Sequence, residues 1–317
     1  MIDFRYHLVS IISVFLALAV GIVVGTTALN GVIVDDLRQR VDGLAADKRA
    51  RETTINDQQR LLTGAGAFAS AVTAQDVAGL LDGRRVTVVS APGVSADDRA
   101  NVIDVLTQAG ATVTTRVRLG DAFTDPKRAS DIEGVATDAA RVQGVSLAGQ
   151  TSVADRAAAA LGAAVVGNGS GSDLGSPTAV SAEQRALDPW RAAGLLTVDQ
   201  QDGPGDLALV LVPSPPNPAP TEDVLTPQVV SLVAVMDARD TGTVVAGPLD
   251  SADGNGLVAA VRGTGQLSSR VSTQDSVETS WGRISLVRTA QAELGGKAGQ
   301  YGAGPGSRAP LPVPASR

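Results

Sequence analysis

The residues of this sequence that could do chemistry are few, and the most suggestive run is Gly167–Asp173 (GNGSGSD). Successive backbone N–H groups in such a loop can cradle a phosphate. The run lacks the Gly-Lys-Ser/Thr of a Walker loop, and G-x-G-x-x-G would need its third glycine where Leu174 stands. A plain loop between a strand and a helix is the alternative. The candidate ligand loop comprises Gly167, Asn168, Gly169, Ser170 and Gly171.

Residues for nucleophilic or metal chemistry are scarce. The chain has no cysteine, a single histidine, His7, and two methionines, Met1 and Met236. A Ser-His-Asp or Cys-His arrangement needs a histidine, and copper sites prefer Cys, Met or His ligands. The acid pairs Asp97-Asp98 and Glu222-Asp223 begin expected helices, where acids stabilise the helix dipole. We therefore predict no enzyme activity, no catalytic residues, and no bound metal or cofactor.

An apolar run near the N-terminus is the first element expected to position the rest of the chain. Residues 8–34 contain no charged side chain. A helix needs about 20 apolar residues to cross a bilayer, whereas the apolar core of a signal peptide is shorter, about 7–15 residues. The run predicts an uncleaved anchor over residues 1–34, packing through the small residues Ala17, Gly21 and Gly25.

The basic residues on the two sides of the apolar run support the two membrane orientations almost equally. Arg5 precedes the apolar run, and Arg38 and Arg40 follow it closely. Basic residues favour the cytoplasmic side of a membrane. We favour a cell membrane protein that crosses once, with a short cytoplasmic N-terminus and everything else extracytoplasmic.

Residues 35–63 are charged, free of proline and apolar at heptad spacing. Lys48, Arg51 and Gln58 interrupt this seam. The pattern predicts a short, imperfect coiled-coil stalk, with a single solvated helix as the alternative. Taken together with the small residues of the anchor, it favours a homodimer or a heteromer. The seam residues are Val34, Leu37, Val41, Leu44, Ile55 and Leu62.

Residues 64–294 predict an α/β domain. Gly64-Ala65-Gly66 is expected to end the stalk helix, and beyond it short apolar strands alternate with amphipathic helices. This alternation predicts a doubly wound, mainly parallel, Rossmann-like sheet. Residues 295–317 are rich in Gly, Pro, Ala and Ser and predict a disordered tail. Strands are expected at 85–90, 111–119, 163–167, 195–198, 206–212, 242–247 and 269–273, and helices at 68–81, 96–108, 130–142, 153–161, 182–193, 222–238, 255–262 and 279–294.

Ligands of open α/β sheets bind at the carboxyl ends of the strands. The loops expected there, besides Gly167–Asp173, are Ala91–Gly93, Pro213–Asn217 and Gly247–Asp250. Ser272, Thr273 and Asp275 end the last expected strand and could line the same cleft. The net charge of −7 and only eight aromatic residues argue against a nucleic-acid partner.

Two stretches resemble a known family. The start MIDFRYHLVSIISVFLALAVGIVVGTTALN and the stretch VSTQDSVETSWGRISLVRTAQAELGGKAGQYG near the C-terminus are similar to the actinobacterial MctB family of copper transport proteins. The resemblance implies a cell-envelope protein, described for the family as outer-membrane, that keeps intracellular copper low, with copper as a transported ion. Similar members are paired with a thiamine-pyrophosphokinase-like membrane protein. That pairing implies an alternative role as a scaffold regulating peptidoglycan hydrolases during cell division.

Overall fold

The computed structural model describes residues 4–166, 177–216, 225–239 and 242–312, with the side chains of 4–5, 26–36 and 177–183 left out. The chain divides into two compact units, Met1–Ala65 and Gly66–Arg317, called here the N-terminal unit and the α/β unit. Helix α1, Phe4–Val77, supplies the described part of the first unit and the opening turns of the second.

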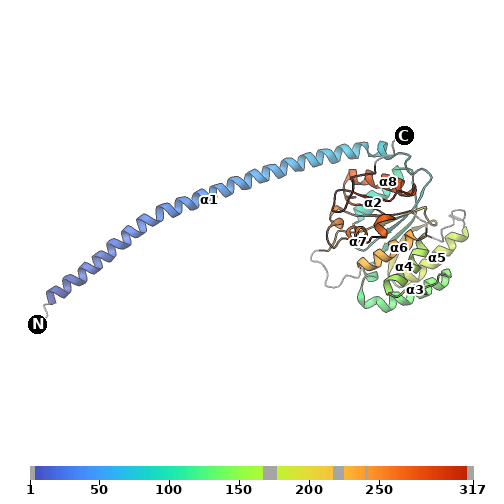
Figure 1. The fold of residues 1–317 in the computed structure, drawn as a ribbon, viewed down its shortest axis with the longest axis horizontal. Coiled ribbons are helices and arrows are strands. Elements are labelled where there is room, and N and C mark those ends of the chain that lie inside the picture. Colours follow the sequence, from blue (N-terminus) through green and yellow to red (C-terminus); the bar gives the residue numbers. More distant parts are fainter. Residues whose placement is uncertain (1–3, 167–176, 217–224, 240–241, 313–317) are drawn as a thin grey trace. The chain divides into compact units, whose positions relative to one another are not determined.

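Within α1, Tyr6–Gly25 is long and apolar enough to cross a membrane, with a mean hydropathy of 2.8. The expected end of the stalk helix at Gly64-Ala65-Gly66 is wrong, because α1 continues to Val77 (Figure 1). Glycine in a helix costs only about 1 kcal/mol relative to alanine. In the α/β unit, buried Ala69 and Val77 anchor the last turns in the core, and Ser70 hydrogen-bonds Ser280 over 2.5 Å.

The α/β unit is built on a seven-stranded sheet of order β3-β2-β1-β4-β5-β6-β7. Neighbouring strands are parallel except the β2–β3 pair, which places an antiparallel strand at one edge. The predicted α/β class with a mainly parallel sheet is confirmed, while the Rossmann-like assignment and the coiled coil stay predictions. The strands are β1 Arg85–Ser90, β2 Thr112–Leu119, β3 Leu196–Gln201, β4 Leu207–Leu211, β5 Gly242–Ala246, β6 Ser272–Gln274 and β7 Gln300–Tyr301.

Helices cover the strands from two sides. Helices α2 and α8 contact each other on one side, and α4 packs with α3, α5 and α6 on the other (Figure 1). Ser95 caps α2 as its Oγ accepts from Asp98 N at 2.9 Å. The remaining helices are α2 Ala96–Gln108, α3 Ala129–Gln143, α4 Val153–Val166, α5 Pro177–Ala192, α6 Leu225–Asp237, α7 Leu257–Gly263 and α8 Ser280–Leu294, with 3-10 turns η1 Asp121–Phe123, η2 Pro126–Arg128, η3 Leu249–Ala252 and η4 Leu267–Ser269.

The expected strand at 163–167 is wrong over its described part, since residues 163–166 form the last turn of α4. Every residue from Ala157 to Val166 is buried, because α4 lies among α3, α5 and α6. A helix buried on all sides has a continuous apolar sequence, which periodicity cannot distinguish from a buried strand. Gly162 allows the close packing, since a Cβ there would lie 2.6 Å from Val235 Cγ1.

The expected disordered tail is also wrong up to residue 312. Gln300 and Tyr301 form β7 beside β6, and Tyr301 bridges to Ala309. The backbone N–H groups of Ala303 and Gly304 donate to the buried carboxylate of Asp275 at 2.7 and 3.1 Å. Backbone hydrogen bonds to the sheet and to one carboxylate therefore order this segment without many apolar side chains.

Glu293 of α8 makes the stability of this part of the molecule pH-dependent. Glu293 is 8% exposed, and its carboxyl accepts hydrogen bonds from Ser272 Oγ and from Thr243 N. Burial raises the pKa of Glu293, and nearby Asp237 adds to the rise. The folded state therefore binds a proton more tightly than the unfolded chain does, and stability falls as pH rises from the ordinary glutamate range through the raised pKa.

We expect Glu293→Gln to remove this dependence, because a neutral amide replaces the carboxyl at every pH. At pH 7.5 the variant should be more stable than the parent, because the parent then holds a charged carboxylate in a buried site. The difference should vanish at pH 4. Urea unfolding of the full chain in detergent at both pH values measures it, and parallel pH curves for the two proteins would contradict the assignment.

Candidate functional site

The sheet topology places a crevice at the carboxyl ends of β1 and β4. The chain moves outward from β1 to β2 and β3, then returns to β4 on the other side of β1. Loops that leave two neighbouring strands in opposite directions diverge, and ligands of open α/β sheets bind in the resulting crevice. A cleft of about 580 Å³ lies there. Its lining residues are Pro92, Gly93, Ser95, Asp98, Asp121, Pro213, Ser214, Pro216, Leu225, Pro248, Leu249, Asp250 and Glu278.

The floor of this cleft is set by two loops that approach closely. After β1, Ala91 N donates to Leu211 O at 2.8 Å, which holds the loop beside the end of β4. Gly93 has φ +85°, and a Cβ there would lie 3.3 Å from Pro213 Cβ. Glycine is suited to this left-handed backbone and also leaves room for the proline.

Four carboxylates face or border the cleft, from Asp98, Asp121, Asp250 and Glu278. Ser95 Oγ lies 2.7 Å from Asp98 Oδ2, and Ser214 Oγ donates to Asp250 Oδ1 at 2.8 Å. Glu278 Oε1 accepts from Leu249 N at 3.3 Å. Burial raises the pKa of Glu278, and the negative charges of Asp98 and Asp250 add to it.

Arg283, a cation close to Asp98 and Glu278, is held by the backbone. Arg283 Nη1 donates to the carbonyl oxygens of Val277 and Glu278 at 3.1 and 3.0 Å. Burial lowers the pKa of Arg283, against the opposing effect of Asp98, Glu278 and Asp104. The lining is therefore acidic with proline walls, which suits a cationic or neutral ligand better than a phosphate.

Three of the loops expected at strand ends do line this cleft, at Pro92-Gly93, Pro213–Pro216 and Pro248–Asp250. The candidate ligand loop Gly167, Asn168, Gly169, Ser170 and Gly171 lies outside the described residues.

The suggestion that Ser272, Thr273 and Asp275 line the cleft is wrong. All three are buried, and their side chains bond Glu293, Gln300 and Arg262 respectively. Asp121 and Glu278 were missed by sequence reasoning, because only the order of strands brings the ends of β2 and β6 to this crevice.

Over the residues that the structure describes, no group of three or more His, Cys, Asp or Glu side chains is placed to hold a metal ion. Met236 is fully buried on α6. His7 lies on α1, inside the apolar span Tyr6–Gly25.

A second candidate site is the seam of α1. Leu37, Val41, Leu44, Ile55 and Leu62 are 59–75% exposed, a high value for apolar side chains. Val34 belongs to α1, but its side chain lies outside the described residues. In the anchor, a Cβ at Gly21 or Gly25 would meet nothing within 4 Å.

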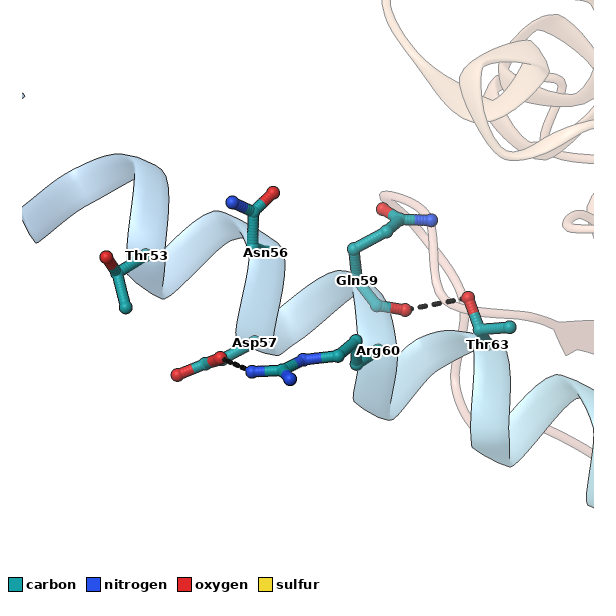
Figure 2. Close-up of a pocket in the computed structure, with 6 residues that line it drawn as sticks. All are labelled: Thr53, Asn56, Asp57, Gln59, Arg60 and Thr63. Carbon is teal, nitrogen blue, oxygen red and sulfur yellow. Dashed lines mark hydrogen bonds and ion pairs between the residues drawn. The ribbon is translucent and has the colours of Figure 1, made fainter. Parts of the chain in front are cut away.

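Residues outside the a and d positions give the same helix a polar face. A hollow of about 630 Å³ is lined by Thr53, Asn56, Asp57, Gln59, Arg60 and Thr63 (Figure 2). Arg60 pairs with Asp57, and Thr63 Oγ1 donates to Gln59 O at 2.8 Å. Since all six residues come from one helix and these bonds stay within it, we interpret this hollow as a solvated helix face.

Comparison with known proteins connects this architecture to a family. The family model described as "Copper transport outer membrane protein, MctB" matches residues 1–312. The protein named Copper transporter MctB of Mycobacterium tuberculosis is 28% identical over 319 residues, covering 97% of this chain and 98% of the relative. The protein of the same name from Mycobacterium leprae is 30% identical over 318 residues, again covering 97% and 98%. The chain therefore belongs to the MctB family.

Proposed function

We propose that this protein is anchored in the cell membrane by α1, places its α/β unit outside the cytoplasm, and helps to keep intracellular copper low. The observation that carries the proposal is the family match across residues 1–312. The apolar span Tyr6–Gly25 supports the anchor. Arg5 ahead of that span favours a cytoplasmic N-terminus.

The atoms of the α/β unit that could bind a metal ion determine how the protein could act on copper. The cleft offers the oxygen atoms of Asp98, Asp121, Asp250 and Glu278. Carboxylates suit hard cations, whereas copper(I) prefers thiolate or thioether and copper(II) prefers imidazole. We therefore propose that the protein acts on copper as part of a larger assembly, with copper as the ion carried.

A deletion strain tests the copper role. We expect cells without the protein to accumulate several-fold more copper than the parent and to stop growing at a lower copper concentration. Expression of the full chain should restore both values. Unchanged copper content and unchanged copper tolerance in the deletion strain would remove this proposal.

A second candidate function is that of a scaffold that pairs through α1 with a helix of a membrane partner and thereby regulates peptidoglycan hydrolases. The exposed apolar residues at heptad spacing favour it, because burying them against another helix removes their apolar area from water. A thiamine-pyrophosphokinase-like membrane protein is the partner that the resemblance of the sequence suggests.

Paired substitutions on the two faces of α1 test the scaffold. We expect Leu44→Asp with Ile55→Asp to weaken partner co-purification at least about 100-fold, since two buried acids should cost well over the ~2.8 kcal/mol that this factor requires. Thr53→Asp with Asn56→Asp adds the same charge to the polar face and should leave co-purification intact. Equal losses in the two variants, or none, would count against the seam.

A further inference from the structure

The charges within the seam of α1 indicate what kind of helix it binds. With Val41 at position a of the heptad, Leu44 is at d, Lys48 at a, Arg51 at d and Ile55 at a. Lys48 and Arg51 therefore occupy two adjacent layers of an otherwise mostly apolar face, and both residues are exposed. Lys48 Nζ lies 3.5 Å from Glu52 Oε1 of the same helix.

A second copy of this chain fits these layers poorly. Two copies anchored in one membrane must pair in parallel, which sets Lys48 against Lys48 and Arg51 against Arg51 at the centre of the interface. Positions g and e of parallel helices also face each other, and here they carry Asp47 and Glu52, again a pair of like charges. In a parallel pair Lys48 at a also lies beside Asp47 at g′, and Arg51 at d beside Glu52 at e′. Self-pairing is therefore opposed mainly by the placing of four cations in two adjacent core layers.

The small residues of the anchor do not support self-pairing at the seam either. Successive residues of an α-helix are rotated by about 100°, which puts the mean direction of Ala17, Gly21 and Gly25 roughly 160° from that of the described seam residues. The described backbone of the N-terminal unit is one uninterrupted helix, so the rotation per residue of an ideal α-helix gives this angle. A second copy packed on the small residues would leave the seam facing away.

We propose that the seam of α1 is occupied by a helix of a different protein, which is apolar at most layers and carries acidic residues at the two layers facing Lys48 and Arg51. Residues of that helix opposite Asp47 and Glu52 are basic. This inference rests on the scaffold function and specifies its partner. The polar residues shown in Figure 2 all lie outside the a and d positions of the seam.

The absence of cysteine from the chain makes a clean cross-linking test possible. Leu44→Cys and Ile55→Cys variants of the full chain are labelled with a thiol-reactive photo-cross-linker in membranes, and Asn56→Cys on the polar face is the control. We expect both seam positions to form an adduct whose mass differs from twice that of the chain, and the control to form it at least tenfold less.

Charge reversal then tests whether the partner helix carries acidic residues opposite Lys48 and Arg51. Lys48→Glu with Arg51→Glu should reduce the adduct at least tenfold, while Arg49→Glu with Arg60→Glu makes the same change in net charge outside the a and d positions and should preserve it. Mass spectrometry of the adduct should locate two acids of the partner at these layers, and changing them to lysine should restore the adduct of the reversed chain.

Three results would overturn the inference. An adduct of two copies of this chain from both seam positions would show that the occupant is a second copy. An adduct with another protein that is insensitive to charge reversal would retain the scaffold function but remove the acidic partner. No adduct at either seam position, together with unchanged co-purification in the Leu44→Asp/Ile55→Asp variant, would remove the scaffold function itself.

Discussion

Asp275→Ala is expected to lower the free energy of unfolding of the α/β unit by about 3–5 kcal/mol, the usual cost of removing one partner from a buried ion pair. Asp275 is fully buried, and Arg262 Nη2 donates to its Oδ2 at 2.9 Å. Ser276 Oγ donates to Oδ1 at 2.8 Å, and the amides of Ala303 and Gly304 donate to the same carboxylate. The substitution removes all of these acceptors at once.

The variant also leaves Arg262 buried without its carboxylate. The Arg262 side chain is 6% exposed, and burial lowers the pKa of its guanidinium while Asp275 opposes that shift. Arg262 also donates to Tyr301 O and Pro305 O, at 2.7 Å in each case. The pair therefore fastens the segment 300–309 to the sheet, and its loss should release this segment first.

Asp199→Ala is the matched control, because it removes an aspartate from an exposed ion pair with Arg118. Exposed pairs contribute about 0.2–1 kcal/mol. Chemical denaturation of the full chain in detergent measures both variants, and hydrogen exchange at residues 300–309 tests the order of release. Similar losses in the two variants would show that the Asp275 cluster is not a centre of stability.

Trp190→Ala is the second large effect that we expect, a loss of about 3–5 kcal/mol in the free energy of unfolding. Trp190 of α5 is fully buried, and its ring lies 6.0 Å from that of Phe123 in a tilted arrangement. Trp190 is the largest fully buried side chain among the residues that the structure describes, so its truncation should leave a large cavity.

Trp190→Phe separates packing from hydrogen bonding. The indole Nε1 is buried without a hydrogen-bond partner in the part of the chain that the structure describes. Replacing it by phenylalanine keeps an aromatic ring against Phe123 and removes an unsatisfied polar group, so we expect a cost below about 1.5 kcal/mol. A loss as large as that of Trp190→Ala would contradict this expectation. Thermal unfolding followed by tryptophan fluorescence and circular dichroism compares the variants.

Local signals in the sequence were enough to predict several elements. The apolar length of residues 8–34 predicts the span Tyr6–Gly25 whatever surrounds it. The acid pair Asp97-Asp98 predicts the start of α2, and the structure shows this helix beginning at Ala96. The apolar runs of β1, β4 and β5 are bounded by turn residues and are strands as expected.

The cleft and the helical form of residues 163–166 depend on contacts between residues distant in the chain. Asp121 and Glu278 reach one crevice because the strand order folds β2, β1, β4, β5 and β6 side by side, and no local pattern encodes that order. Residues 163–166 are helical because α4 is enclosed by other helices.

The sequence by itself determined which segments are apolar, where helices begin, and that one face of α1 repeats every seven residues. These are properties of neighbouring residues, whose spacing alone sets burial and capping. Only the tertiary structure decided that Gln300 and Tyr301 join the sheet and that the chain up to Ala309 is held beside them, since this segment is poor in apolar side chains and is ordered by the buried carboxylate of Asp275. That carboxylate can bind the amides of Ala303 and Gly304 only after β6 and β7 have paired. No sequence pattern within either strand predicts that pairing.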